Sequence, residues 1–333
     1  MREFLERLFR HGFLSVEESR AILKEIAAGK YAPTQVAAFL TVFCMRPIGV
    51  DELQGFRAAM LDLCLPVDLS PYDAVDLVGT GGDGKDTFNI STLAALVTVG
   101  AGQRVAKHGN YAASSVCGAS NVLEQVGVYF PKTAAQAQAQ IERSGFCFLH
   151  APIFHPAMKH LAPIRKELGV RTFFNLLGPL VNPAAPPAQV VGVATFGLQR
   201  LYHYLLQQLG VKYVVLHSLD GYDEISLTSP CLLQGRNEER LLEPKDWGCQ
   251  AVRAQDLSGG RSVTESAEIF MRILQGQGTP AQERVVCVNA AAALKLCGRA
   301  ADYKEAVEMA RESLRSGKAL AVLEALRQEG PKT

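Results

Sequence analysis

The first 65 residues carry the apolar and polar pattern of helices. Apolar side chains recur three and four residues apart, as they do along one face of an amphipathic helix. Ser15 is suited to cap the second helix, because two glutamates stand in the first turn that follows it. Pro33 is suited to begin a third helix, and Asp51 is suited to begin a fourth. The pattern predicts an all-helical opening unit that ends in a linker at residues 66–71.

From residue 75 onward, short apolar strands alternate with helices. Helices are expected from about residue 91 and over residues 199–209, and again toward the C-terminus. Strands that alternate with helices pair in parallel, and helices then cover both faces of their sheet. The predicted fold class is therefore α/β, with a mostly parallel central sheet flanked by helices, plus the small all-helical domain. The expected strands are residues 75–78, 103–106, 189–195, 213–217 and 284–289, and edge strands and loops are expected within 241–262.

A glycine-rich segment, GTGGDGKDTFNIST at residues 79–92, follows the first expected strand. It has the glycine spacing of a dinucleotide-binding turn, but no Asp or Glu stands between Thr87 and Asn121 to bind a ribose. A Walker A loop needs Ser or Thr where this chain has Asp86. A turn without a ligand would need fewer glycines and hydroxyl groups. The segment is interpreted as another kind of phosphate-binding loop, whose backbone N–H groups approach an anion ahead of a helix.

Two further polar segments follow expected strands. Residues 107–115 form a loop with a lysine and two serines, which is suited to an anion. His108 alone is more typical of a hydrogen-bonded structural residue than of a catalyst. Asp223 and Glu224 are adjacent carboxylates, which suit Mg²⁺ because this ion shares its ligands with phosphate groups. Such a pair is often only solvated, so the metal hypothesis depends on the two anion loops.

The composition limits the classes of partner. The chain has 333 residues with 34 Lys and Arg against 33 Asp and Glu, a balance that argues against nucleic-acid binding. It has no apolar signal-peptide core and no apolar stretch near the ~20 residues that span a bilayer, so no membrane partner is expected. The eight cysteines form no Cys-x-x-Cys pair and are expected to be free thiols. A soluble cytoplasmic protein is predicted.

The motifs at residues 79–92, 107–110 (KHGN), 171–183 (RTFFNLLGPLVNP) and 223–227 (DEISL) together resemble the anthranilate phosphoribosyltransferase family. They occur in the family's order, and the resemblance covers nearly the whole chain. It implies transfer of the phosphoribosyl group of phosphoribosyl pyrophosphate to anthranilate. The products would be N-(5-phosphoribosyl)anthranilate and pyrophosphate, in the third step of tryptophan biosynthesis.

The resemblance also implies an architecture like that of the nucleoside phosphorylase class II proteins. Its small helical domain would span residues 1–65 and be completed by helices around 165–185, and its α/β phosphoribosyl-binding domain would span 75–330. A homodimer joined through the helical domain and Mg²⁺ as cofactor are further implications. No protein nucleophile is expected, because an oxocarbenium-like sugar needs none.

The family's functional residues carry over to positions of this chain. Magnesium would be held by Ser91, Asp223 and Glu224, and anthranilate by Gly79, Asn110, Arg165 and Pro179. The residues expected to bind phosphoribosyl pyrophosphate are Gly79, Gly82, Asp83, Thr87, Asn89, Ile90, Ser91, Thr92, Lys107, His108, Gly109, Asn110, Ser114, Ser115 and Ala119.

The second loop departs from the family's usual pattern. Tyr111 stands where many members have Arg, Val116 where many have a basic residue, and Cys117 where many have Ser. Two alternatives share the fold. A pyrimidine nucleoside phosphorylase is disfavoured by the Asp-Glu pair, since phosphorolysis has no pyrophosphate to escort. A non-catalytic nucleic-acid-binding paralogue should be basic, and this chain is nearly neutral.

Overall fold

The computed structural model describes residues 1–112 and 115–328, which belong to two compact units. The helical unit comprises Met1–Pro66 and Ala151–Pro183, and the α/β unit comprises Val67–His150 and the chain from Ala184 onward. The segment 151–183, here called the return segment, therefore leaves the α/β unit and comes back to it. Within the described residues, every helix is too short or too polar to span a lipid bilayer.

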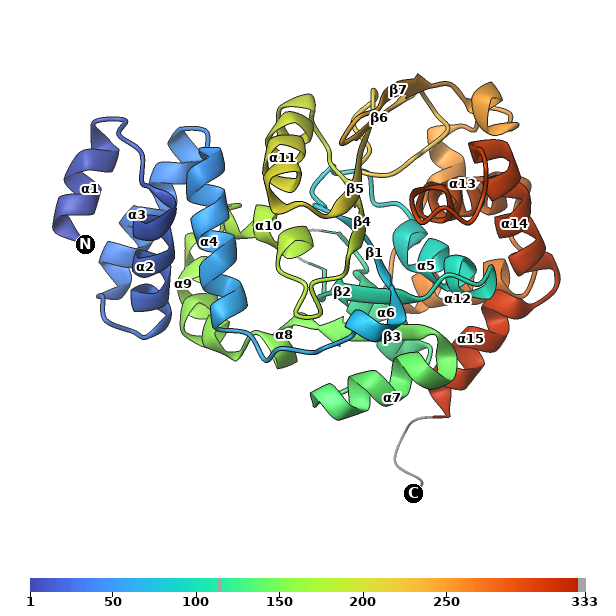
Figure 1. Ribbon diagram of the computed structural model, residues 1–333, viewed down its shortest axis with the longest axis horizontal. Helices are drawn as coiled ribbons and strands as arrows, with labels where there is room; N and C mark the ends of the chain where they lie inside the picture. Colours follow the sequence, from blue (N-terminus) through green and yellow to red (C-terminus); the bar gives the residue numbers. More distant parts are fainter. Residues whose placement is uncertain (113–114, 329–333) are drawn as a thin grey trace. The chain divides into compact units, whose positions relative to one another are not determined.

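The helical unit confirms the four helices expected within residues 1–65 (Figure 1). Ser15 and Glu18 form a capping box, in which each side chain accepts a hydrogen bond from the other residue's backbone N–H. The helices of this unit are α1 (Arg2–Phe9), α2 (Val16–Ala27), α3 (Pro33–Met45), α4 (Val50–Asp62), α8 (Ala151–Phe154), α9 (Leu161–Leu168) and α10 (Phe174–Leu177).

Phenylalanine rings fill the centre of the helical unit. Phe39 of α3 contacts Phe56 of α4 edge to face, and Phe173 of the return segment stacks on Phe56 with ring centroids 4.3 Å apart. Gly55 lets α4 approach α2 closely, since a Cβ at this position would lie 2.3 Å from the Val16 carbonyl oxygen. The return segment thus contributes to the same apolar core as the N-terminal helices.

The α/β unit confirms the predicted fold class. Its seven-stranded sheet has the order β3-β2-β1-β4-β5-β6-β7, parallel from β3 to β5 and antiparallel at β6 and β7. Of these strands, β3 and β6 were not predicted from the sequence. The strands are β1 (Val75–Gly79), β2 (Val105–Gly109), β3 (Phe146–His150), β4 (Ala188–Gly192), β5 (Lys212–Ser218), β6 (Cys231–Gly235) and β7 (Glu239–Leu242).

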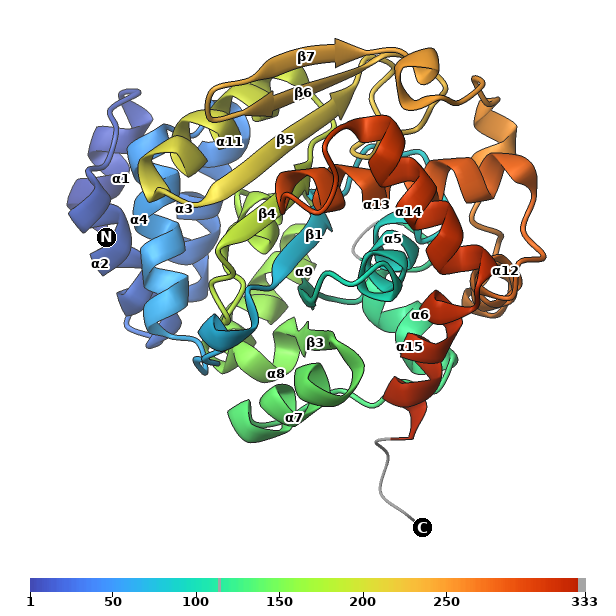
Figure 2. The same ribbon diagram turned by 45° about the vertical axis from the view of Figure 1, so that its right-hand side comes forward.

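Helices cover both faces of this sheet. In Figure 1, α5 and α13 lie on one side of the strands and α11 lies on the other, and Figure 2 shows α13 and α14 in front of the strands. The helices of this unit are α5 (Ile90–Gly100), α6 (Ala119–Gln125), α7 (Ala134–Ser144), α11 (Phe196–Leu209), α12 (Val263–Leu274), α13 (Pro280–Leu296), α14 (Tyr303–Arg315) and α15 (Lys318–Arg327).

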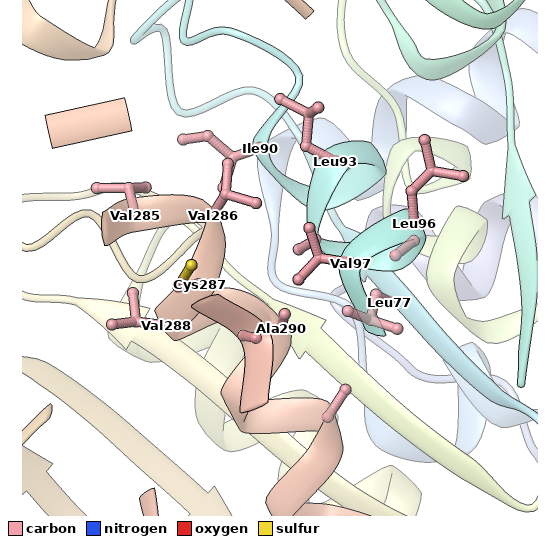
Figure 3. Packing of buried hydrophobic residues seen from close by; sticks show 14 of the residues in the cluster. Leu77, Ile90, Leu93, Leu96, Val97, Val285, Val286, Cys287, Val288 and Ala290 are labelled. Atoms are coloured by element: carbon pink, nitrogen blue, oxygen red, sulfur yellow. The ribbon is translucent and has the colours of Figure 1, made fainter. Parts of the chain in front are cut away.

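The strand expected at residues 284–289 is wrong, because this segment lies inside α13. Thr279 caps the helix, Pro280 occupies its first turn, and the apolar run continues through four alanines. The residues from Val285 to Leu294 are buried, and they pack against Leu93 and Val97 of α5 (Figure 3). A helix that is buried all round lacks the polar face that marks most helices, so its apolar run resembled a buried strand.

The order of the strands creates a crevice at one end of the sheet. The chain passes from β1 outward to β2, and from β4 outward to β5 on the other side. The carboxyl ends of β1 and β4 therefore flank a topological switch point, where open α/β sheets bind their ligands. The glycine-rich segment begins at this end of β1.

Candidate active site

The glycine-rich segment leaves β1 as a loop and ends in the first turn of α5, as predicted. Gly81, Gly82 and Gly84 have φ angles of +66°, +76° and +70°, which residues with a Cβ rarely adopt. Asp86 also has a positive φ, of +47°, and its carbonyl group accepts a hydrogen bond from the Gly259 N–H. Backbone of this kind can present several N–H groups to one anion.

Both carboxylates of the acidic pair bind this loop. Asp223 Oδ2 accepts a hydrogen bond from the Gly81 N–H at 2.6 Å, and Glu224 Oε1 accepts one from the Ser91 N–H at 3.1 Å. Glu224 Oε2 also accepts a hydrogen bond from the Thr87 hydroxyl at 3.3 Å. The structure therefore brings the loop, the start of α5 and the acidic pair together.

Two glycines let Asp223 lie over the strand ends at the switch point. A Cβ at Gly79 would lie 2.4 Å from Asp223 Oδ2, and a Cβ at Gly192 would lie 1.6 Å from the Asp223 carbonyl oxygen. Sequence reasoning missed Gly192. The signal that could have identified it is the position of a glycine at the end of an apolar strand. It also missed Asn289 of α13, whose amide exchanges two hydrogen bonds with the Ile225 backbone.

A cavity of about 20 Å³ lies among these groups. This volume holds one water molecule or an ion of similar size. Because the acidic pair and the Ser91 side chain share the cavity with strand ends, the polar groups can act on one bound species. The cavity is lined by Leu77, Val78, Gly79, Ser91, Ala94, Val190, Gly192, Leu216, Asp223, Glu224 and Asn289.

The site concentrates negative charge. Burial, and then the nearby Asp83 carboxylate, raises the pKa of Asp223 to about 7. Burial, and then Asp223, raises the pKa of Glu224 well above its usual range. Asp83 Oδ2 is buried and has no hydrogen-bond partner within the described part of the chain. A cation in the cavity would relieve this repulsion.

The second predicted loop begins on β2 and reaches the first loop through a buried lysine. Lys107 is 2% exposed, and its ammonium group donates to the Leu77 carbonyl oxygen and lies 3.5 Å from Ser91 Oγ. Burial lowers the pKa of Lys107, against the attraction of Asp76 and Glu224. His108 is also buried, and its backbone N–H donates to Asp76 Oδ1 at 3.4 Å.

A hydrogen bond also links the rest of the second loop to the first. The Asn89 side chain donates from Nδ2 to the Cys117 carbonyl oxygen at 3.0 Å. Asn110 and Ser115 are exposed, and Ala119 begins α6. Gly109 ends β2, and Ser114 lies outside the described residues.

Two expected substrate residues of the first loop have side chains that face the interior. Ile90 is fully buried and packs beside α13 (Figure 3), and Thr92 is 1% exposed. Gly82 is exposed in the loop, whereas Asp83 and Thr87 are half-buried. Any substrate contact made by Ile90 would therefore involve its backbone rather than its side chain.

The residues expected to hold anthranilate belong to both units. Gly79 and Asn110 lie in the α/β unit, and Arg165 and Pro179 lie in the helical unit. The Arg165 guanidinium stands 5.0 Å from the centre of the Phe174 ring, and burial lowers its pKa. Among the described residues it has no carboxylate partner. Pro179 is buried in the 3₁₀ turn Gly178–Leu180.

Comparison with known proteins assigns the chain to a family. Residues 71–320 match the α/β domain of a glycosyl transferase family, and residues 2–64 match its helical bundle domain. The anthranilate phosphoribosyltransferase of Flavobacterium johnsoniae is 51% identical over 98% of this chain and 99% of its own. That of Christiangramia forsetii is 52% identical over 96% of both chains. The chain belongs to the anthranilate phosphoribosyltransferase family.

Solved structures of anthranilate phosphoribosyltransferases share the fold. The enzyme of Thermus thermophilus is 36% identical, with a TM-score of 0.91 over 97% of this chain and 98% of that one. The enzyme of Saccharomyces cerevisiae, solved in complex with PRPP and Mg, is 28% identical, with a TM-score of 0.90 over 98% and 96%. The same yeast enzyme has also been solved in complex with 4-fluoroanthranilate.

In this member of the anthranilate phosphoribosyltransferase family, Tyr111 of the second loop makes contacts with α6 and β3. The Tyr111 hydroxyl donates to Glu124 at 3.3 Å, and the Tyr111 ring packs edge-on against His150. Val116 is exposed, and Cys117 is buried. All eight cysteines are free thiols, as predicted.

Proposed function

We propose that the chain transfers the phosphoribosyl group of phosphoribosyl pyrophosphate to anthranilate, which yields N-(5-phosphoribosyl)anthranilate and pyrophosphate. One observation carries the proposal: the glycine-rich loop, the start of α5 and the acidic pair meet around one cavity at the switch point of the sheet. The names and complexes of the relatives support the same reaction. Neither a nucleoside phosphorylase nor a nucleic-acid-binding paralogue is favoured by these relatives.

Magnesium fits the donor set of the site. Ser91, Asp223 and Glu224 would hold it, because hard oxygen ligands around a small cavity suit this ion and two carboxylates leave room for phosphate oxygens. Within the described residues, no group of three or more His, Cys, Asp or Glu side chains is arranged as a complete metal site. Bound magnesium would offset the charge that builds on the departing pyrophosphate.

The protein's own groups would bind and orient the phosphates. The N-terminus of α5 is a positive helix end, and the glycine-rich loop before it supplies N–H groups besides those of Gly81 and Ser91, which Asp223 and Glu224 bind. They would stabilise negative charge as the bond between the sugar carbon and pyrophosphate breaks. The turn at Gly81, Gly82 and Gly84 would present these donors to the substrate phosphates.

Arg165, Asn110, Gly79 and Pro179 would position anthranilate. The Arg165 guanidinium has a planar fork suited to a carboxylate, and its contact with Phe174 leaves that fork unpaired within the described residues. The amine of anthranilate is neutral near pH 7 and would attack the anomeric carbon directly. Its proton would leave to water or pyrophosphate, so orientation is the main task of the protein.

We also propose that the chain forms a homodimer and is located in the cytoplasm. A homodimer joined through the helical domain would follow the family resemblance. A cytoplasmic location fits eight free thiols, since a reducing compartment keeps cysteines unpaired.

A fluorescence assay tests the transfer. Anthranilate fluorescence should fall only when phosphoribosyl pyrophosphate and Mg²⁺ are both present, and omission of either is the control. Thymidine and uridine with phosphate should give no free base. A folded protein that leaves anthranilate unchanged, or that cleaves either nucleoside, would contradict the proposal.

A further inference from the structure

Lys85 lies in the middle of the glycine-rich loop, where a Walker A loop has the lysine that reaches the phosphates of a nucleotide. In this chain its ammonium group lies 4.6 Å from the centre of the Tyr222 ring. A cation over the face of an aromatic ring is attracted by the electrons of that ring. Because Tyr222 directly precedes the acidic pair, the contact attaches the loop to the segment that carries Asp223 and Glu224.

The Tyr222 ring is a fixed support for this contact. Only 4% of Tyr222 is exposed, and the residue belongs to the apolar core of the α/β unit. The Ser218 backbone N–H donates to the Tyr222 carbonyl oxygen at 3.2 Å, which closes the turn after β5. Within that turn, a Cβ at Gly221 would lie 3.9 Å from Lys85 Cε. The aliphatic chain of Lys85 therefore lies along the turn, and its charged end lies over the ring.

The ammonium group of Lys85 rests on this ring although carboxylates stand near it in the loop. Asp83 and Asp86 are two residues and one residue away along the chain. Within the described residues, however, Lys85 forms no ion pair. A lysine that paired with Asp223 or Glu224 would occupy the oxygens proposed for magnesium. An ammonium group held on the ring leaves both of these carboxylates available to a metal ion.

Other contacts hold the two ends of the loop. At its start, the Thr80 N–H donates to the Gly192 carbonyl oxygen at 2.9 Å, and at its end the Phe88 N–H donates to the Leu257 carbonyl oxygen at 3.0 Å. The span between these ends contains three glycines with positive φ angles, and glycine loses the most conformational freedom when a loop is ordered. Lys85 adds a contact within this span, so less ordering is left for the moment at which a phosphate binds.

We propose that Lys85 is a positioning residue for phosphoribosyl pyrophosphate. By lying on the Tyr222 ring, its ammonium group fixes the middle of the glycine-rich loop in the arrangement that binds the phosphates. The inference rests on the proposed function and adds to it a residue that touches neither the substrate nor the metal. Because the contact exists before the substrate arrives, its loss should loosen the free loop and thereby weaken substrate binding.

Hydrogen exchange of the free chain, followed by mass spectrometry, tests the attachment of the loop. Lys85→Met keeps the aliphatic chain and removes the charge, so the amides of residues 80–86 should exchange about fivefold faster. Lys85→Arg retains a cation for the ring, and its loop should exchange as that of the unmodified chain does. The amides of α13 should exchange equally in all three proteins. Unchanged exchange at residues 80–86 in Lys85→Met would overturn the proposal, because a direct phosphate contact acts only once substrate is bound.

Calorimetric titration of the full chain with phosphoribosyl pyrophosphate and Mg²⁺ gives a second readout. Lys85→Met should weaken binding about fivefold, and Lys85→Arg should weaken it less than twofold. In a Tyr222→Leu background, Lys85→Met should cause less than a twofold further loss, because its support is gone. A full fivefold loss in that background would show a direct contact with the substrate and refute the positioning role. If Tyr222→Leu does not fold, the exchange of the free loop in Lys85→Met and Lys85→Arg still decides.

Arg104→Met is the matched control for both measurements. The Arg104 guanidinium lies 5.4 Å from the centre of the Tyr72 ring, but Arg104 precedes β2, at the opposite end of the sheet from the loop. This variant removes a contact of the same kind, so substrate binding should change less than twofold and residues 80–86 should exchange as before. A loss as large as that of Lys85→Met would mean that Lys85 has no specific effect on the loop.

The outcomes also separate this inference from the proposed function. If the unmodified chain binds magnesium and phosphoribosyl pyrophosphate but leaves anthranilate unchanged, the transfer proposal fails, while exchange and binding still decide the role of Lys85. If transfer occurs and Lys85→Met binds phosphoribosyl pyrophosphate as tightly as the unmodified chain does, the transfer proposal stands and the positioning role is wrong.

Discussion

Each unit buries carboxylates, and the two units treat them differently. Glu52 of the helical unit is fully buried and forms a two-point ion pair with Arg46, with N···O distances of 2.9 and 2.5 Å. Its oxygens also accept hydrogen bonds from the Leu14 and Gly49 N–H groups. Each of the two Glu52 oxygens accepts two hydrogen bonds, and Arg46 balances its charge, so this carboxylate needs no bound cation.

The acidic pair of the α/β unit has donors but too little positive charge. Asp223 and Glu224 accept hydrogen bonds from N–H and hydroxyl groups. Burial and then the Asp83 charge raise the pKa of Asp223, and burial, the Asp223 charge and the Asp83 charge raise the pKa of Glu224. The Glu52 carboxylate is neutralised within the fold, whereas the proposed magnesium site would need a cation to neutralise its carboxylates.

The largest expected effect is on the stability of the helical unit. Glu52→Gln should lower the free energy of unfolding by about 3–5 kcal/mol, because Arg46 would remain buried without its counter-charge. Urea denaturation measures this loss. Arg2→Gln is the control, since the exposed Arg2–Glu6 pair should matter little. A loss below about 1 kcal/mol for Glu52→Gln would remove the contrast between the units.

The acidic pair should behave in the opposite way. The double variant Asp223→Asn, Glu224→Gln should reduce transfer roughly 100-fold or more, because the charge that attracts magnesium is gone. Its unfolding free energy should be unchanged or higher, since two like charges are no longer buried together. Steady-state kinetics and urea denaturation check the two halves. Unaltered turnover, or a large loss of stability, would mean that Asp223 and Glu224 have a structural role like that of Glu52.

A smaller effect is expected from crowding at the switch point. Gly192→Ala should reduce transfer about tenfold by displacing the Asp223 backbone, from which its Cβ would stand 1.6 Å. Gly197→Ala is the matched control, because no atom of the described residues lies within 4 Å of a Cβ there. The two variants should therefore differ in kcat more than in expression. Similar kinetics in both would mean that Asp223 tolerates movement.

The smallest effect is on pH dependence within the helical unit. Burial lowers the pKa of His155 to about 4, so on acidification the unfolded chain binds a proton near pH 6.5 before the folded chain does. Stability from neutral His155 is therefore complete above pH 6.5 and is lost as pH falls toward 4. The cost at pH 5.5 should be about 1 kcal/mol.

Urea denaturation at pH 7.5 and 5.5 measures this cost against His155→Gln. The side chain of the variant does not titrate, so the unmodified chain should lose about 1 kcal/mol more than the variant on acidification. Equal losses in the two proteins would show that His155 does not control the acid sensitivity of the unit.

The candidate site was predictable where its signals are local. Residues 79–92 carry their own turn and helix signals, and Asp223 and Glu224 are adjacent, so composition and spacing selected both as candidates, and the structure places them together. Gly192, Asn289 and the Arg46–Glu52 pair were missed, because their roles depend on neighbours that are distant along the chain. The buried helix at 284–289 was mistaken for a strand for the same reason, since tertiary burial removed its polar face.

The sequence by itself determined the four N-terminal helices, the α/β class, the glycine-rich loop and the acidic pair, because capping residues, glycines and residue periodicity act over a few positions. Only the tertiary structure decided which strands are neighbours, which carboxylates are neutralised, and that Lys107 lies beneath Ser91 instead of facing solvent. These outcomes depend on burial and on electrostatic contacts between distant segments, which no local pattern specifies.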